Sequence, residues 1–141
     1  MEQSILDYYH SKKAGNIGDV WKHLILCEVV QALLDTSVSE TFTYVETHCA
    51  YPHYAFDHTG EWVYGIGRCF MLSQHLLSRP YFQLNNPATM NDYVKKIEVN
   101  EVPEPPYIYL GSAALTLQMA MNAGRAYAAG FMTIILTLSA R

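Results

Sequence analysis

The first candidate for chemistry is a polar segment near the N-terminus, HSKKAGNIGDVWKH, which covers residues 10–23. It contains His10, His23 and Asn16, and it leads directly into an apolar stretch. Its lysines are Lys12, Lys13 and Lys22. Imidazole and amide groups donate and accept hydrogen bonds, and ammonium groups attract phosphates. The segment is therefore either a solvated helix entry or one wall of a ligand site that offers lysines to phosphate groups.

A second candidate is a histidine-rich segment between residues 48 and 58. Its possible metal ligands are His48, Cys49, His53, Asp57 and His58. Imidazole, thiolate and carboxylate groups all bind zinc, but the closely spaced ligand pairs of common zinc motifs are absent. A histidine-bearing loop at the end of a strand is the simpler interpretation, and we assign no metal site. A metal-dependent hydrolase remains a weaker alternative.

The elements that must position these residues alternate between helical and strand patterns. Apolar residues recur at helical spacing over residues 18–34, with Asn16 or Asp19 available to cap the first turn. We expect Trp21, Leu24 and Leu33 in the core. Residues 41–47 predict a strand that ends at a loop beginning with His48. The other predictions are an irregular stretch over 49–60, helices over 63–77, 86–97 and 113–122, a connection over 99–106, and strands over 107–109 and 131–138.

This alternation favours an α/β layer architecture with a parallel sheet. Two or three strands form a poor parallel sheet, because each strand needs neighbours at both edges and cover on both faces. We therefore expect a single domain over residues 1–141 whose strand set is truncated, as in the first half of a larger sheet. Open strand edges predict a homodimer or a partner chain.

Composition narrows the class of protein. The 141 residues are 50% hydrophobic, which is enough for one continuous core. The formal charge of −4 argues against binding nucleic acid through overall charge and leaves a local basic face for RNA. The three cysteines form no CxxC pair, which suits a reducing compartment such as the cytoplasm. The most apolar run, residues 126–138, is too short to span a bilayer, and the first residues lack the pattern of a secretory signal.

Several short motifs occur together in one order and register. They are Tyr8-x-His10-Ser11, Ala14-Gly15-Asn16-x-x-Asp19-Val20-x-Lys22-His23, Tyr44-x-Glu46-Thr47-His48, Gly60-Glu61-x-x-x-Gly65-Ile66-x-Arg68 and Tyr109-x-Gly111-Ser112. In this arrangement the chain resembles the RlmJ-type 23S rRNA (adenine-N6)-methyltransferases. The blocks cover most of residues 8–115, and the second block is the most specific.

The resemblance implies a class I methyltransferase (Rossmann-like) fold with a helical insertion after the first strand, at about residues 60–100. It implies transfer of a methyl group from S-adenosylmethionine to N6 of an adenine in ribosomal RNA. The positions that match cofactor-binding residues of the family are His23, His48 and Ser112. The positions expected on the substrate side are Tyr8, His10, Asn16 and Lys22.

The chain departs from the family pattern in two places. The loop over residues 48–54 has no glycine where the family has a glycine-rich turn. The family's Asp-Pro-Pro-Tyr motif is missing from its expected place, and Glu104-Pro105-Pro106-Tyr107 only imitates it. Because a proline pair in a loop needs no functional reason, Glu104 and Tyr107 are weak catalytic candidates. The alternative to an enzyme is an inactive relative that serves as a nucleic-acid or cofactor-binding module or as a partner subunit.

Overall fold

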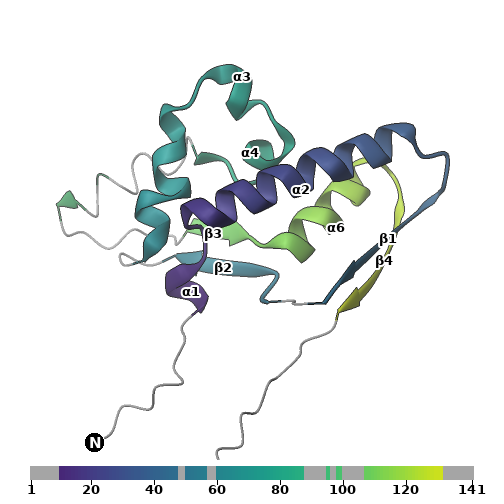
Figure 1. Ribbon diagram of the computed structural model, residues 1–141, viewed down its shortest axis with the longest axis horizontal. Helices are drawn as coiled ribbons and strands as arrows, with labels where there is room; N and C mark the ends of the chain where they lie inside the picture. The colour runs from purple at the N-terminus through teal and green to yellow at the C-terminus, as the bar shows by residue number, and fades with distance from the viewer. Residues whose placement is uncertain are drawn as a thin grey trace, which may run out of the picture.

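The computed structural model describes residues 10–47, 50–56, 60–87, 95, 98–99 and 107–131. Their elements, in chain order, are α1 (His10–Lys13), α2 (Ile17–Thr36), β1 (Thr41–Glu46), β2 (His53–Phe56), the 3-10 helices η1 (Glu61–Tyr64) and η2 (Ile66–Met71), α3 (Gln74–Leu77), α4 (Pro80–Leu84), β3 (Tyr107–Leu110), α6 (Ser112–Asn122) and β4 (Ala126–Phe131). The long α2 crosses the molecule beside α6, with β2 and β3 toward the left of the view and β1 and β4 toward the right (Figure 1).

Helix α2 begins where the sequence predicts it. Asn16 is the N-cap, and its Oδ1 accepts the backbone N–H of Asp19 at 2.9 Å. Asp19 in turn accepts the N–H of Gly15 through Oδ2 at 3.0 Å, so the first turn is closed from both sides. The helix ends at Thr36, and the N–H of Ser37 donates to the carbonyl of Leu33. The predicted helix over residues 18–34 is confirmed and extends slightly at both ends.

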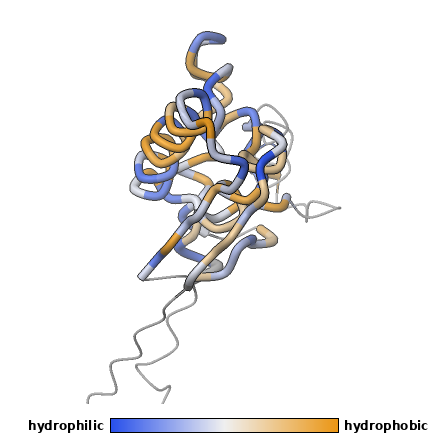
Figure 2. Tube along the Cα trace, turned by 90° about the vertical axis from the view of Figure 1, so that its right-hand side faces the viewer, coloured by the Kyte–Doolittle hydropathy of each residue, from blue (hydrophilic) through white to orange (hydrophobic). Residues whose placement is uncertain are grey.

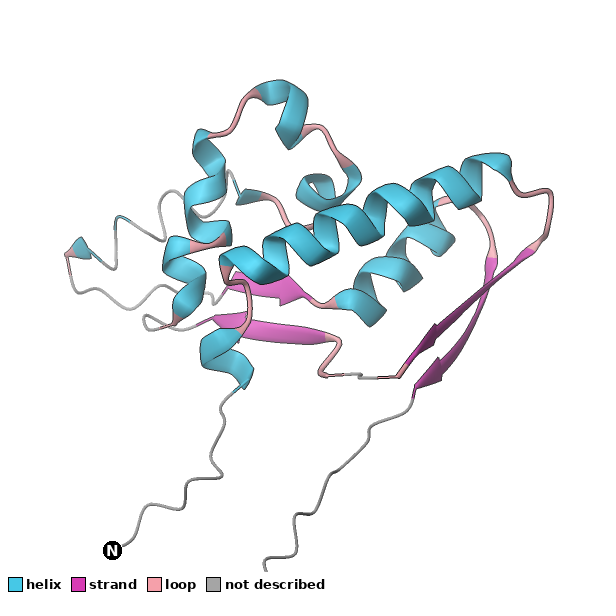
Figure 3. Cartoon of the chain, in the orientation of Figure 1, coloured by secondary structure: helices cyan, strands magenta, loops and turns pink. Residues whose placement is uncertain are grey.

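The predicted parallel pairing is present in a small sheet. Strand β1 pairs in parallel with β4, from Thr41 opposite Ala126 to Glu46 opposite Phe131. Helix α6 connects β3 to β4 and packs against both α2 and β4. Strand β4 begins earlier than the predicted strand over 131–138, and residues 132–138 lie outside the described part. The outcome is a mixed α/β fold with a two-stranded parallel sheet (Figure 3).

A second, antiparallel sheet corrects the prediction for residues 49–60. These residues were expected to be irregular, yet β2 pairs with β3 from His53 opposite Leu110 to Phe56 opposite Tyr107. Alternate side chains of β2, Tyr54 and Phe56, are buried, which stabilises a short strand. The expected strand at 107–109 is confirmed. Because β2 intervenes, the helical segment follows β2 and not β1 directly.

The helical segment is also more broken than the sequence suggests. The continuous helix predicted over 63–77 is wrong, because η1, η2 and α3 replace it, and α4 follows. Gly65 and Gly67 lie within this segment, and glycine weakens α-helix. The helix predicted over 86–97 falls mostly on residues outside the described part.

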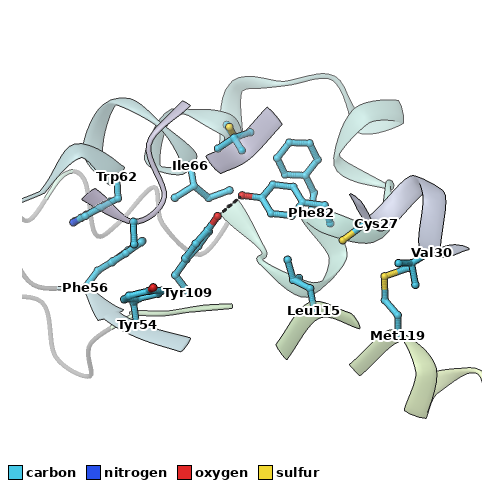
Figure 4. Packing of buried hydrophobic residues seen from close by; sticks show 14 of the residues in the cluster. Cys27, Val30, Tyr54, Phe56, Trp62, Ile66, Phe82, Tyr109, Leu115 and Met119 are labelled. Carbon is cyan, nitrogen blue, oxygen red and sulfur yellow. Dashed lines mark hydrogen bonds between the residues drawn. The ribbon is translucent and has the colours of Figure 1, made fainter. Parts of the chain in front are cut away.

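The core between α2, α6 and the antiparallel sheet is largely aromatic (Figure 4). The ring of Phe56 stacks on Trp62 with centroids 5.1 Å apart and on Tyr109 at 5.3 Å. Apolar side chains of α2 and α6, including Cys27 and Leu115, complete this cluster. Offset aromatic stacking adds to the hydrophobic gain of burial, so this cluster fixes where β3 lies.

One face of α2 is apolar and exposed, and we call it the α2 apolar face. Its residues recur every four positions and are Ile17, Trp21, Ile25, Val29 and Leu33. Trp21 is 60% exposed, so the prediction that Trp21 and Leu33 lie in the core is wrong, whereas Leu24 packs against the core. Apolar residues lie all around α2, so the spacing of apolar residues in the sequence could not distinguish its buried face from its exposed face. Figure 2 shows hydrophobic residues, in orange, recurring along the helices. In the described part, no helix has both the length and the apolar character needed to cross a membrane.

Candidate functional site

A pocket of about 460 Å³ lies where the carboxyl end of β1 meets the first turns of α2 and α6. This volume falls within the range of small-molecule sites. Its lining carries both signs of charge, with Lys13 and Lys22 as cations and Asp19 and Glu46 as carboxylates. A pocket of this kind suits a ligand that itself bears both charges.

The entry to α2 forms one wall, and a distant motif holds it in place. Gly15 has a φ of 76°, and its carbonyl accepts the N–H of Ile66 at 2.9 Å. A Cβ on Gly65 would stand 2.0 Å from this carbonyl oxygen, so only glycine permits the approach. Glu61 binds Lys13 in an ion pair and accepts a hydrogen bond from Asn16 Nδ2 at 3.1 Å. The motif blocks around residues 14–23 and 60–68 therefore meet in space.

Asn16 lines the pocket, but its amide group also has a structural task. Its oxygen caps α2 and its nitrogen donates to Glu61. Lys22 lies one turn further along, and its Nζ is 2.8 Å from Asp19 Oδ1. The Lys22 side chain is 70% exposed, so this pair is screened by water and contributes little to stability. The Lys22 side chain is therefore more available to a ligand than the amide group of Asn16.

His23 faces the pocket and is held by a chain of hydroxyl groups. Its Nδ1 lies 2.8 Å from the Tyr109 hydroxyl, which lies 3.2 Å from the Tyr81 hydroxyl (dashed in Figure 4). Burial lowers the pKa of His23, although the nearby Asp19 carboxylate opposes that shift. Burial also raises the pKa of Tyr109. The His23 ring is thus neutral and fixed in orientation at neutral pH.

Glu46 is the carboxylate at the end of β1. It accepts the Ser112 hydroxyl at 2.9 Å through Oε1 and at 2.8 Å through Oε2. Tyr44 donates to its Oε2 at 3.1 Å, and burial raises the pKa of Tyr44 to about 12, so this phenol stays a donor. Ser112 is the first residue of α6, where backbone N–H groups favour a negative charge nearby.

The loop before β2 closes the pocket from another side. Ala50, Tyr51 and Tyr54 line the pocket. The N–H of Tyr51 donates to the Tyr54 hydroxyl at 3.2 Å, and the N–H of Gly111 donates to the carbonyl of Pro52 at 2.8 Å. The loop is thereby tied to the start of α6.

The pocket brings together four of the residues assigned to cofactor or substrate binding from the sequence, namely Asn16, Lys22, His23 and Ser112. Tyr8, His48, Glu104 and the side chain of His10 lie outside the described part, and their roles stay predictions. Tyr107 is placed elsewhere: its ring stacks on Phe56, with centroids 5.8 Å apart, within the aromatic core. It is absent from the residues that line the pocket.

Other lining residues were not assigned from the sequence. These are chiefly Asp19, Glu46, Tyr51 and Tyr109. Glu46 gave a usable signal, because a carboxylate that ends a strand of β-branched and aromatic residues is out of place in a core. Tyr109, on the short strand β3, gave no such signal, because tyrosines pack in cores as often as they line sites.

Of the possible metal ligands between residues 48 and 58, the structure describes only His53, which is exposed on β2. Among the residues that the structure describes, no three His, Cys, Asp or Glu side chains are arranged to hold a metal ion. Cys27 and Cys69 are free and buried, and burial raises the pKa of their thiols to about 12 and about 11. Both thiols are therefore poor nucleophiles and poor metal ligands.

Comparison with known proteins gives a distant relative. The chain is similar to ribosomal RNA large subunit methyltransferase J of Haemophilus influenzae (strain ATCC 51907 / DSM 11121 / KW20 / Rd), with 29% identity over 128 residues. The match covers 86% of this chain and 41% of that protein, so the chain spans about two fifths of the length of this curated relative. No family model matches the chain, and no solved structure matches it. The similarity supports a methyltransferase-like relationship.

Proposed function

We propose that the pocket binds S-adenosylmethionine and that the protein acts in methylation of adenine N6 in ribosomal RNA. The observation that carries this proposal is the convergence of Asn16, Lys22, His23 and Ser112 on one pocket. These residues come from motifs that resemble a methyltransferase family, and the similar protein is named as a ribosomal RNA methyltransferase.

The chemistry of the pocket fits the cofactor. S-adenosylmethionine carries an ammonium, a carboxylate and a sulfonium, and when bound it supplies an electrophilic methyl group. Asp19 and Glu46 would attract its positive groups, and Lys13 would attract its carboxylate. The site lies at the carboxyl end of β1, where ligands bind in open parallel sheets.

The residues of the chain would mainly bind and orient the reactants. A neutral His23 adds no positive charge beside a sulfonium, and its bond to Tyr109 fixes the ring. Ser112 holds Glu46 in one orientation. Lys22, exposed at the pocket, offers a local positive charge to an RNA phosphate. A substrate of this kind and the free thiols Cys27 and Cys69 both fit a cytoplasmic setting.

A binding module is the second candidate. It is favoured by the position of Tyr107, which packs on Phe56 and does not line the pocket. In that case the protein would retain the cofactor site or the RNA contact without transferring a methyl group, and it would work as a partner subunit.

We also propose that a second copy of the chain covers the α2 apolar face. The exposed apolar residues are spaced symmetrically about Ile25, so an antiparallel copy of α2 centred on Ile25 would set Trp21 of one copy against Val29 of the other.

Two measurements made in parallel test the proposed function, one of ligand binding and one of methyl transfer. A saturating concentration of S-adenosylhomocysteine should raise the melting temperature of the protein, since a ligand that binds the native state stabilises it. Transfer of a tritiated methyl group to unmethylated 23S rRNA measures activity. His23→Ala should reduce both signals, whereas His53→Ala, on an exposed residue of β2, should leave both unchanged. Binding without transfer would favour the binding module, and no binding would remove the proposed site.

A further inference from the structure

The proposed function leaves one feature of the pocket unused. The loop before β2 has no glycine between residues 48 and 54 and carries Tyr51, whose ring lines the pocket while remaining 70% exposed. Exposure of a large aromatic ring at the mouth of a pocket leaves one of its surfaces available to a ligand.

The backbone that carries this ring is fixed. The N–H of Tyr51 donates to the hydroxyl of Tyr54, a buried residue of β2, at 3.2 Å. The two rings meet edge to face, with centroids 6.1 Å apart and planes at 83°. The next residue, Pro52, accepts the N–H of Gly111 at 2.8 Å. Tyr51 is therefore held between β2 and the start of α6.

The described part of this loop also packs closely against the start of α6. A Cβ on Gly111 would lie 2.8 Å from the carbonyl oxygen of Tyr51, so the loop and the start of α6 are in close backbone contact. A ring held in place loses little conformational entropy when a ligand stacks on it. An exposed, positioned aromatic ring beside lysines is the usual platform for a nucleobase.

We propose that Tyr51 stacks against the purine ring of a nucleoside bound in the pocket. This inference rests on the proposed function and adds the residue that recognises the base. The purine has two sources with the same chemistry, the adenine of the cofactor and the adenine of the RNA. Lys13 and Lys22 line the same pocket and would bind the anionic groups that accompany either nucleoside.

Calorimetric titration tests the inference. The ligands are S-adenosylhomocysteine, homocysteine as a control without a base, and a single-stranded oligoribonucleotide with one adenine compared with the same strand lacking that base. The variants are Tyr51→Ala, Tyr51→Leu and Tyr51→Phe. Because stacking contributes about 1–3 kcal/mol per base, Tyr51→Ala should weaken binding of the stacked ligand by roughly 5- to 150-fold. Tyr51→Phe should bind within about twofold of the wild-type protein, since only the hydroxyl is lost.

The possible results distinguish the two sources of the purine. They also distinguish failure of the stacking role from failure of the proposed function. A loss confined to S-adenosylhomocysteine identifies the base of the cofactor, and a loss confined to the oligoribonucleotide identifies the base of the RNA. Unchanged affinity of Tyr51→Ala for both ligands would overturn the stacking role and leave the proposed function standing. Equal affinity of Tyr51→Leu and Tyr51→Phe would also overturn it, because leucine keeps apolar area without an aromatic face. If the wild-type protein binds neither ligand, the proposed function fails and the stacking role fails with it. Thermal melts check that each variant is folded.

Discussion

Ser112 at the start of α6 donates its hydroxyl hydrogen to the carboxylate of Glu46 at the end of β1, with Oγ 2.9 Å from Oε1 and 2.8 Å from Oε2. The two residues are 66 positions apart in the sequence. Their contact joins the first strand to the helix that leads into its parallel partner, and it places a half-buried carboxylate in the pocket.

Ser112→Ala should therefore reduce stability and ligand binding together. The substitution removes a hydrogen bond to a charged group, which costs about 1–3 kcal/mol of the free energy of unfolding. Urea unfolding measures this loss, and Ser112→Thr is the control because threonine keeps the hydroxyl. Equal stability of the alanine variant and the wild-type protein would mean that Tyr44 and water satisfy Glu46 without Ser112.

Gly65→Ala should be among the most destabilising single changes in the chain. Its Cβ would stand 2.0 Å from the Gly15 carbonyl oxygen and 2.7 Å from the carbonyl carbon of Asn16, and these backbone atoms cannot move without disturbing the start of α2. We expect a loss of about 3 kcal/mol or more in urea unfolding. The matched control is Gly130→Ala, whose Cβ would meet nothing closer than Val45 at 3.8 Å. A loss for Gly65→Ala no larger than that for Gly130→Ala would contradict the close packing.

Because burial keeps His23 neutral, we expect the free energy of unfolding to decrease on mild acidification. Burial holds its folded-state pKa below the ordinary value of 6.5, so the unfolded chain binds a proton more readily than the native state. The stability that the neutral ring provides is present above about pH 6.5 and is lost as the pH falls below it. The urea concentration at the midpoint of unfolding should therefore decrease when the pH is lowered from about 7.5 to about 5.5. The fall should be smaller in His23→Gln, and an equal fall in this variant and in the wild-type protein would exclude His23 as the cause.

The α2 apolar face predicts self-association. Light scattering after gel filtration should give the mass of a dimer for the wild-type protein, and Ile25→Lys should give a monomer, because it places a charge at the centre of the face. Val38→Lys is the control, since Val38 is 98% exposed and lies beyond the end of α2. A wild-type monomer at high micromolar concentration would contradict the second copy as the occupant.

Local signals in the sequence predicted the elements that depend on them. The helices α2 and α6 and the strand β1 have regular apolar or β-branched patterns and clear end residues, such as Asn16, and they were placed within two residues. Strand β2 was missed because it is four residues long and is stabilised by pairing with β3, far away in the chain. The break of the predicted helix over 63–77 follows from the contact of Gly65 with Gly15, which is also non-local.

In the candidate site, too, some residues could be predicted from the sequence and others depend on contacts between distant parts of the chain. His23 and Ser112 were predicted through resemblance to a family, and they line one pocket. Tyr109 entered the site through a contact with His23 that the sequence does not reveal. Glu46, which Ser112 holds in the site, gave a local signal as a carboxylate at the end of a strand. The exposure of Trp21 was missed for a related reason, because burial of one helix face depends on which neighbours exist and not on the helix itself.

The most direct test of the cofactor site is an NMR titration of the isotopically labelled protein with S-adenosylhomocysteine. The account predicts that the backbone amide signals that shift most belong to pocket residues, in particular Gly18, Asp19, Gly111 and Ser112, with Gly124 and Val38 as distant references. Saturable shifts in the pocket signals would support binding there. The absence of any shift at millimolar ligand, or shifts confined to residues away from the pocket, would contradict it.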